Sequence, residues 1–209
     1  MEHIRFHFDP ICPWAWLTSR WAARLVELGE LEVTWAFFAL AEQNQTLLTD
    51  PEHRQLATAP LRLLALARRR GGNDAVGRLY TAVGEARHRR SEPIGEAPVL
   101  EACLRAAGLD PAWMAESARD DSCWDEVLAD HRAAVQQCGA FGVPTLILDG
   151  GAGPGAFGPV ITEVPDDAEA VALLHDTVRC LRRPYLYELK RERGDTRPVL
   201  DAPSRAPSA

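Results

Sequence analysis

Apolar and polar positions alternate at the start of the chain and then change to a helical spacing. Residues 3–8 show the period of two that a strand requires, and residues 13–28 carry apolar side chains at helical spacing until Gly29 ends the pattern. A second alternating stretch at residues 31–38 is rich in strand-forming side chains. These elements predict a β-α-β unit, which normally closes with its two strands parallel.

The pattern is helical from about residue 51 to residue 138 and returns to strands only afterwards. The predicted helices cover residues 60–70, 75–87, 98–107 and 122–137, with glycine- or proline-containing turns between them. The later elements are a strand at residues 145–149, a glycine-rich turn at 150–155, a partner strand at about 157–161 and a helix at about 166–182.

The order of these elements predicts an α/β fold of the thioredoxin type with a large helical insertion. We expect residues 1–45 and 139–193 to form the thioredoxin-like domain and residues 46–138 to form the inserted helical domain. Residues 194–209 are rich in Pro, Arg, Ser and Ala, so we expect this tail to be partly disordered.

Charge and composition restrict the partners. The formal net charge of −7 over 209 residues argues against nucleic acid and anionic membranes. Charged side chains in the first strand exclude a signal peptide, and no run of apolar residues approaches the length of a membrane span, so we expect a cytoplasmic protein. We expect its substrate to be a small molecule held between the thioredoxin-like domain and the helical insertion. Five irregularly spaced cysteines predict free thiols in a reducing compartment, and six scattered histidines give no metal-ligand spacing.

Cys12 is the main candidate for chemistry because it stands where the first strand meets the first helix. Unpaired backbone N–H groups and the helix dipole favour the reactive thiolate at a helix N-terminus. Pro13 suits the first helical position, where its missing N–H costs nothing. A Cys-x-x-Cys motif would have its second thiol at Ala15, so Cys12 cannot form the usual four-residue disulfide.

A second candidate is the Val143-Pro144 pair directly before the third predicted strand. In a thioredoxin-type chain a cis-proline at this place faces the reactive cysteine. We therefore expect a cis peptide bond at Pro144 that lies opposite Cys12.

With these features the chain resembles the DsbA-like branch of the thioredoxin superfamily, and within it the actinobacterial mycothiol-dependent nitroreductases. The resemblance runs nearly end to end. It rests on residues 8–14, Trp16, residues 18–21, Leu40-Ala41 with Asn44, residues 79–84, residues 143–145, residues 157–160 and residues 187–191.

The resemblance implies roles for individual residues. Cys12 would be the nucleophile. The residues implied in shaping the site and binding substrate are Pro13, Trp14, Asn44, Val143 and Pro144. It also implies a low-molecular-weight thiol such as mycothiol and allows a reduced deazaflavin coenzyme, although no Gly-x-Gly-x-x-Gly motif follows the first strand. Ala15 departs from the family pattern, which commonly has cysteine there, and puts dithiol chemistry in doubt.

A single thiol leaves three functions open. Cys12 could form a mixed disulfide that a second small thiol resolves. It could instead add to an electrophilic carbon, as an isomerase or thiol transferase would. Hydroxychromene-carboxylate isomerases and kappa-class glutathione transferases have a similar fold but usually place serine at this position, so cysteine favours redox chemistry. The third alternative is a binding protein without catalysis.

We interpret the histidines as structural or solvent-exposed residues. His7 precedes the end of the first strand and could tune Cys12, but a structural role is the favoured interpretation. His53 and His88 fall in the helical insertion, and we expect both to face solvent.

Overall fold

The structure is a computed structural model that describes residues 1–44 and 49–192. The expected domain boundary at residues 45 and 46 and the expected disordered tail lie outside the described residues. None of the helices in the described part of the chain has the length and apolar character of a membrane span.

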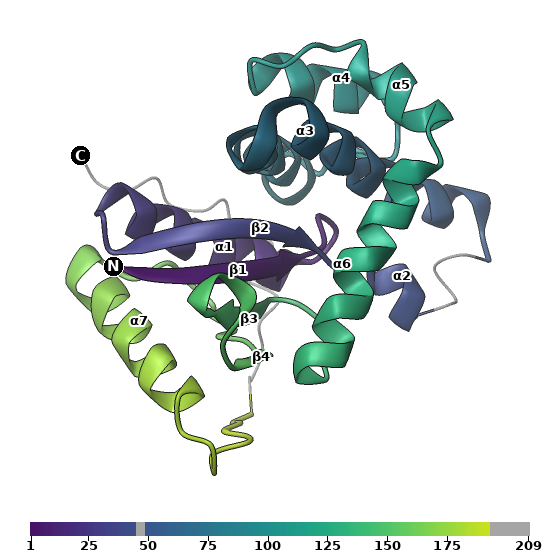
Figure 1. Cartoon of the computed structure of the whole chain (residues 1–209). Coiled ribbons are helices and arrows are strands. Elements are labelled where there is room, and N and C mark those ends of the chain that lie inside the picture. Colours follow the sequence, from purple (N-terminus) through teal and green to yellow (C-terminus); the bar gives the residue numbers. More distant parts are fainter. Residues whose placement is uncertain (45–48, 193–209) are drawn as a thin grey trace.

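A four-stranded mixed sheet organises the molecule. Its strands are β1 (Glu2–Phe8), β2 (Leu31–Phe37), β3 (Thr145–Leu148) and β4 (Gly155–Phe157), in the order β2-β1-β3-β4. β1 and β2 are parallel, as the β-α-β pattern predicts, and helix α1 (Pro13–Glu27) connects them. β3 and β4 are antiparallel to their neighbours. Figure 1 shows α1 behind the strands and the arrows of β1 and β2 pointing toward α6.

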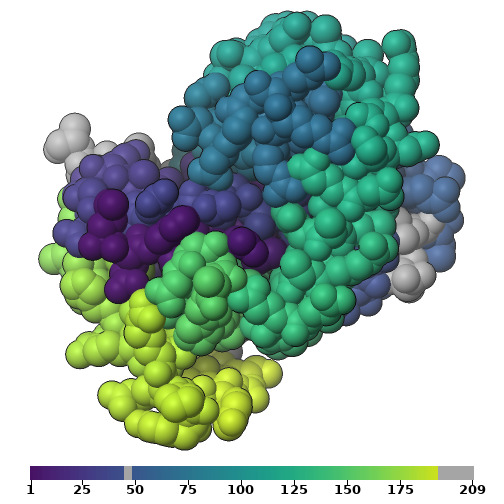
Figure 2. Space-filling model, in the orientation of Figure 1, coloured from purple at the N-terminus to yellow at the C-terminus, as the bar shows by residue number. Residues whose placement is uncertain are grey.

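Helices occupy the chain between β2 and β3. They are α2 (Leu40–Gln43), α3 (Pro51–Gly84), the π-helical turn η2 (Glu85–Arg89), α4 (Ala97–Ala106), α5 (Trp113–Arg119) and α6 (Ser122–Cys138). In Figures 1 and 2 the helices α3, α4 and α5 gather in a lobe beside the sheet, and α6 leads the chain back to it. The last helix, α7 (Asp167–Leu181), contacts α1. The fold is therefore the thioredoxin fold with a helical insertion.

Several predicted boundaries were wrong. The break expected at Gly71-Gly72 is present as a kink within the element α3, where Gly72 has a left-handed φ of 69°, but the helix before it begins at Pro51 instead of residue 60. Strand β4 covers Gly155–Phe157 instead of residues 157–161, so it begins at the last residue of the stretch expected as a turn and ends where the strand was expected to begin. The short helices α2 and α5 were not expected, because four to seven residues are too few to show a helical period.

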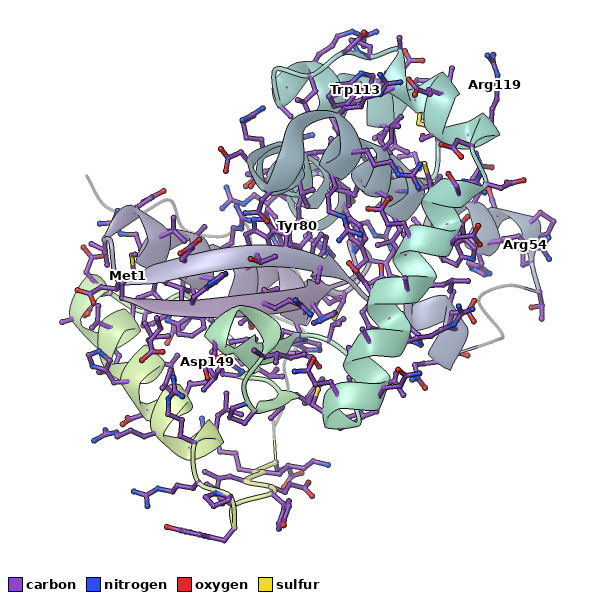
Figure 3. The ribbon with its side chains drawn as sticks, viewed as in Figure 1. Met1, Arg54, Tyr80, Trp113, Arg119 and Asp149 are labelled. Atoms are coloured by element: carbon purple, nitrogen blue, oxygen red, sulfur yellow. The ribbon has the colours of Figure 1, made fainter. Side chains whose placement is uncertain are left out.

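The core joins the sheet to the helical insertion through aromatic rings. Tyr80 of α3 stacks on Phe8 of β1, with ring centroids 3.8 Å apart, and meets the edges of Trp16 and Trp35. Figure 3 shows Tyr80 between α3 and the sheet. A Cβ at Gly84 would lie 2.1 Å from the Trp16 ring, so glycine is required for α3 to approach α1 this closely.

Candidate active site at the N-terminus of α1

Cys12 is the N-cap residue of α1. Its Sγ accepts a hydrogen bond from the Ala15 backbone N–H at 3.5 Å, and Pro13 occupies the first helical position. The Cys12 residue is 8% exposed, so the sulfur lies at the edge of the core. A helix N-terminus and a donated N–H both favour the thiolate, as the sequence predicts for this position.

The loop before β3 lies directly against this sulfur. The Cys12 thiol donates a hydrogen bond to the Val143 carbonyl oxygen at 3.4 Å, and the Val143-Pro144 peptide bond is cis. The sheet register explains the proximity, because Thr145 of β3 pairs with His7 of β1, five residues before Cys12. Two segments 131 residues apart in sequence therefore meet at one point.

Position 15 carries no second thiol. The Ala15 side chain is fully buried beneath the first turn of α1, and no disulfide joins any of the five cysteines, all of which lie within the described residues. The site is a monothiol site with a peptide carbonyl beside the sulfur.

The other predicted site residues lie at varying depth. Trp14 is partly buried and packs against the core, and Pro13 is partly exposed beside it. Asn44 is exposed at the end of α2, where its backbone N–H donates to the Leu40 carbonyl at 2.8 Å. Val143 is buried and reaches the site through its carbonyl oxygen.

Asp9 is a neighbour of the site for which the sequence suggested no role. Its carboxylate accepts hydrogen bonds from the backbone N–H groups of Ile11 at 3.1 Å and Leu40 at 2.9 Å, and it is fully buried. Burial raises the pKa of Asp9 to about 7. Aspartate is common in turns because its side chain accepts the backbone N–H two residues later. This preference could have indicated the contact between Asp9 and Ile11 from the sequence.

His88 corrects a prediction, because it does not face solvent. Its Nε2–H donates to the Pro10 carbonyl oxygen at 2.9 Å, and its ring stacks on Trp16. Burial lowers the pKa of His88 to about 4, so the imidazole is neutral near pH 7. The residue lies in η2, and π-helical turns are frequent at functional sites. His7, in contrast, is buried in β1 and its Nδ1 meets the Phe37 carbonyl oxygen at 3.2 Å.

The segments that carry the family resemblance converge on α1. Arg20 lies over the Trp16 ring, with its guanidinium carbon 4.1 Å from the ring centroid, and donates to Thr81 Oγ1 at 3.0 Å. Thr18 donates its hydroxyl hydrogen to the Pro159 carbonyl oxygen at 2.9 Å. These motifs therefore hold the helix that presents Cys12.

The surface has two further features. Phe141, two residues before Val143, is 67% exposed and stacks on Phe157 with ring centroids 4.9 Å apart. A cavity of about 300 Å³ opens among α2, α3 and α6. Its lining residues are Glu42, Arg54, Thr58, Arg62 and Trp124, and none of them was predicted. Within the described residues, no three metal-ligating side chains gather at one point.

One family model matches most of the chain, and one curated relative is similar over nearly its whole length. The model of the Rv2466c-like family, described as mycothiol-dependent nitroreductase Rv2466c, matches residues 11–191. The protein Rv2286c of Mycobacterium tuberculosis, described as uncharacterized, is 32% identical over 200 residues, covering 93% of this chain and 84% of the relative.

Solved structures share the fold at low identity. The cytosolic disulfide reductase DsbM from Pseudomonas aeruginosa, in a structure with GSH, has a TM-score of 0.60 at 16% identity, over 85% of this chain and 99% of DsbM. A 2-hydroxychromene-2-carboxylate isomerase has a TM-score of 0.59 at 15% identity, over 85% of this chain and 94% of the isomerase. The fold is thus a DsbA-like thioredoxin fold. From the extent of the family match and the relative at 32% identity, the chain belongs to the Rv2466c-like family and is an enzyme of the thiol oxidoreductase kind.

Proposed function

We propose that this enzyme uses Cys12 as its single redox thiol, together with a low-molecular-weight thiol of the mycothiol kind, on a small-molecule substrate. The observation that carries the proposal is the position of Cys12 Sγ, at the N-terminus of α1 and 3.4 Å from the Val143 carbonyl oxygen. The family to which the chain belongs supports the choice of thiol.

The chemistry needs one cysteine and two exchange steps. The Cys12 thiolate attacks one sulfur of a substrate disulfide, forms a mixed disulfide and releases the other half as a thiolate, which takes up a proton. The thiolate of the small thiol then attacks the sulfur of the bound half. This step regenerates Cys12 and leaves that half joined to the small thiol. One disulfide and one thiol are consumed and one of each is formed, so no outside oxidant or reductant is required.

The surrounding residues suit these steps. The Val143 carbonyl can accept a hydrogen bond from a bound thiol or substrate N–H, with Pro144 fixing the loop. Pro13 begins the helix whose N–H groups stabilise the thiolate. Trp14 and the exposed Phe141 offer apolar surface to the substrate, and Asn44 offers an amide at the end of α2.

A reduced deazaflavin coenzyme is the second cofactor that the family resemblance allows. The cavity beside α2 has a lining of mixed charge, because Glu42 lies there with Arg54 and Arg62 and the Arg62 guanidinium already pairs with Asp121 at 2.9 Å, so we assign no coenzyme to it. A reduced deazaflavin would supply two reducing electrons. We further propose a cytoplasmic location, since the five cysteines form no disulfide within the described residues and reducing compartments keep thiols reduced.

A thiol-addition isomerase or transferase is the alternative that Ala15 favours, since addition and expulsion need only one thiol. The two functions differ in their need for a second thiol. Turnover of an electrophilic alkene with no added thiol would identify an isomerase, and an adduct with the alkene that only a second thiol releases would identify a transferase.

The proposal is tested by mass spectrometry of the chain after incubation with mycothiol disulfide. We expect one adduct with the mass of one mycothiol half, located at Cys12 and released by added mycothiol. The Cys12→Ser variant should form none. The matched control is Cys138→Ser, which removes another partly buried cysteine and should still form the adduct.

A Cys12 that stays unmodified by the disulfide and by alkylating agents would overturn the enzymatic proposal and favour a binding protein. The same alkylation, followed against pH, should show a midpoint below the value of about 8.5 that an ordinary cysteine has.

A further inference from the structure

The Asp9 carboxyl connects two segments that the proposed reaction requires. One oxygen accepts the Ile11 N–H in the loop that leads to Cys12, and the other accepts the Leu40 N–H at the first residue of α2. The Asp9 carbonyl oxygen also accepts the Cys12 N–H at 3.0 Å. One residue therefore fixes the nucleophile's backbone and the beginning of the helical insertion.

Within residues 1–44 and 49–192, no cation pairs with the Asp9 carboxylate. Its pKa is set by burial, which raises it, and by the two backbone N–H groups, which lower it. Asp9 and Cys12 both act on the buried Tyr80 hydroxyl of α3, and so does the Arg20 guanidinium of α1 with the opposite sign. Neutral His88 of η2 binds the adjacent Pro10 carbonyl. From α2 only the Leu40 backbone reaches the carboxyl.

We propose that Asp9 is a positioning residue for Cys12. When the Asp9 carboxyl ionises, it strengthens the two hydrogen bonds that join the Cys12 loop to α2, and its negative charge opposes formation of the Cys12 thiolate. This proposal rests on the proposed role of Cys12 as the nucleophile. An ionised carboxylate accepts both N–H groups strongly, whereas a protonated one carries an O–H on one oxygen and holds one N–H less well. A negative charge near the sulfur disfavours a second negative charge there.

The two titrations are therefore coupled, and their order is predictable. Burial raises the pKa of Asp9 to about 7, so its charge changes near neutral pH. As the pH rises through this value, the hydrogen bonds from Ile11 and Leu40 to the Asp9 carboxyl become stronger, while the Cys12 thiolate becomes harder to form. The Cys12 thiol then titrates over a broader and higher range than it would beside a neutral side chain.

The test measures the alkylation rate of the Cys12 peptide against pH in the full chain and in Asp9→Asn. The amide has nearly the shape of the protonated carboxyl but cannot ionise. We expect the midpoint to fall by about 0.5–1 pH unit and the profile to narrow to a single titration. A purely structural role for Asp9 would change the rate without moving this midpoint.

The matched control is Asp166→Asn. Asp166 also accepts a backbone N–H at a helix N-terminus, from Glu169 at 3.0 Å, but it is exposed beside α7. Its neighbour Asp167 pairs with Arg24, twelve residues or about 18 Å along α1 from Cys12. The control should leave the Cys12 midpoint unchanged.

A second measurement applies if Asp9→Asn does not fold. Carbon-13 NMR of the Asp9 carboxyl should give a lower midpoint in Cys12→Ser than in the unsubstituted chain, because coupling is reciprocal. Equal midpoints in either experiment would overturn the positioning role while leaving the nucleophile in place. A Cys12 that is never alkylated would overturn the proposed function. In that case the Asp9 midpoints of the unsubstituted chain and of Cys12→Ser would still test the coupling between the two groups.

Discussion

One methyl group separates the candidate site at Cys12 from a dithiol site. Ala15 is buried below the first turn of α1, three residues after Cys12, and its backbone N–H already contacts the Cys12 sulfur. Residues three apart on a helix lie within the separation that a disulfide spans. The backbone is thus built for a Cys-x-x-Cys pair, and the chain lacks only the second sulfur.

Ala15→Cys should consequently create a disulfide with Cys12. After mild oxidation we expect the mass to fall by two hydrogens and Cys12 to resist alkylation until dithiothreitol is added. Mass spectrometry of the tryptic peptides measures both effects. Ala23→Cys is the control, because position 23 lies on the same helix about 16 Å from Cys12. An Ala15→Cys chain that keeps both thiols free under oxidation would show that the first turn is not poised for the bond.

The sequence was most informative at this scale for Cys12 and Pro144 and least informative for Asp9 and His88. A helix start and a proline before a strand are local patterns, so residues 12 and 144 could be found without coordinates. The Asp9 and His88 contacts reach Leu40 and Pro10, which are 31 and 78 residues away, and no local pattern encodes such a partner.

At the scale of elements, the close approach of α3 to α1 supports the site. Trp16 follows Cys12 by one turn of helix, and its ring lies against Gly84 at the end of α3. Arg20 ties the same helix to Thr81. The orientation of α1, and with it the direction of the Cys12 side chain, depends on these contacts.

Gly84→Ala should destabilise the chain by about 1–3 kcal/mol, because the new methyl group would overlap the Trp16 ring. Trp16→Leu removes the ring atoms that the methyl group meets. We expect the double variant to lose less free energy of unfolding than the sum of the two single losses, measured by urea denaturation. Additive losses would mean that the Gly84 contact does not limit the packing.

Long elements were predicted closely and short ones were not. Helices α6 and α7 lie within a residue of their expected ranges, since both are long and amphipathic. Strand β4 was displaced and α2 was missed, because three or four residues carry too little periodic signal and their positions are set by pairing with β3 and by the Asp9 carboxyl.

At the scale of the whole molecule, His88 joins the helical insertion to the loop that leads to Cys12. Its imidazole is neutral in the folded chain because burial lowers the pKa of His88 to about 4. The unfolded chain takes up the proton near the ordinary value of about 6.5. Between these values the unfolded state binds more protons, so the stability that neutral His88 contributes is complete above about pH 6.5 and is lost as the pH falls.

His88→Gln keeps an N–H donor for the Pro10 carbonyl but does not titrate. Relative to this variant, the free energy of unfolding of the unsubstituted chain should fall by about 2 kcal/mol between about pH 7 and about pH 5. Urea denaturation at several pH values measures the difference. A difference that stays constant over this range would contradict the buried, neutral state of His88.

The sequence by itself determined the order of elements, the thioredoxin-type fold, the position of Cys12 at the start of a helix and the family, because each is written in local periodicity or in short motifs. Only the tertiary structure decided what surrounds the sulfur. The Val143 carbonyl contacts Cys12, and the Asp9 carboxyl and His88 bind the loop before it to α2 and η2, all through packing between segments distant in sequence. Their chemistry follows from burial, which exists only once the chain has folded.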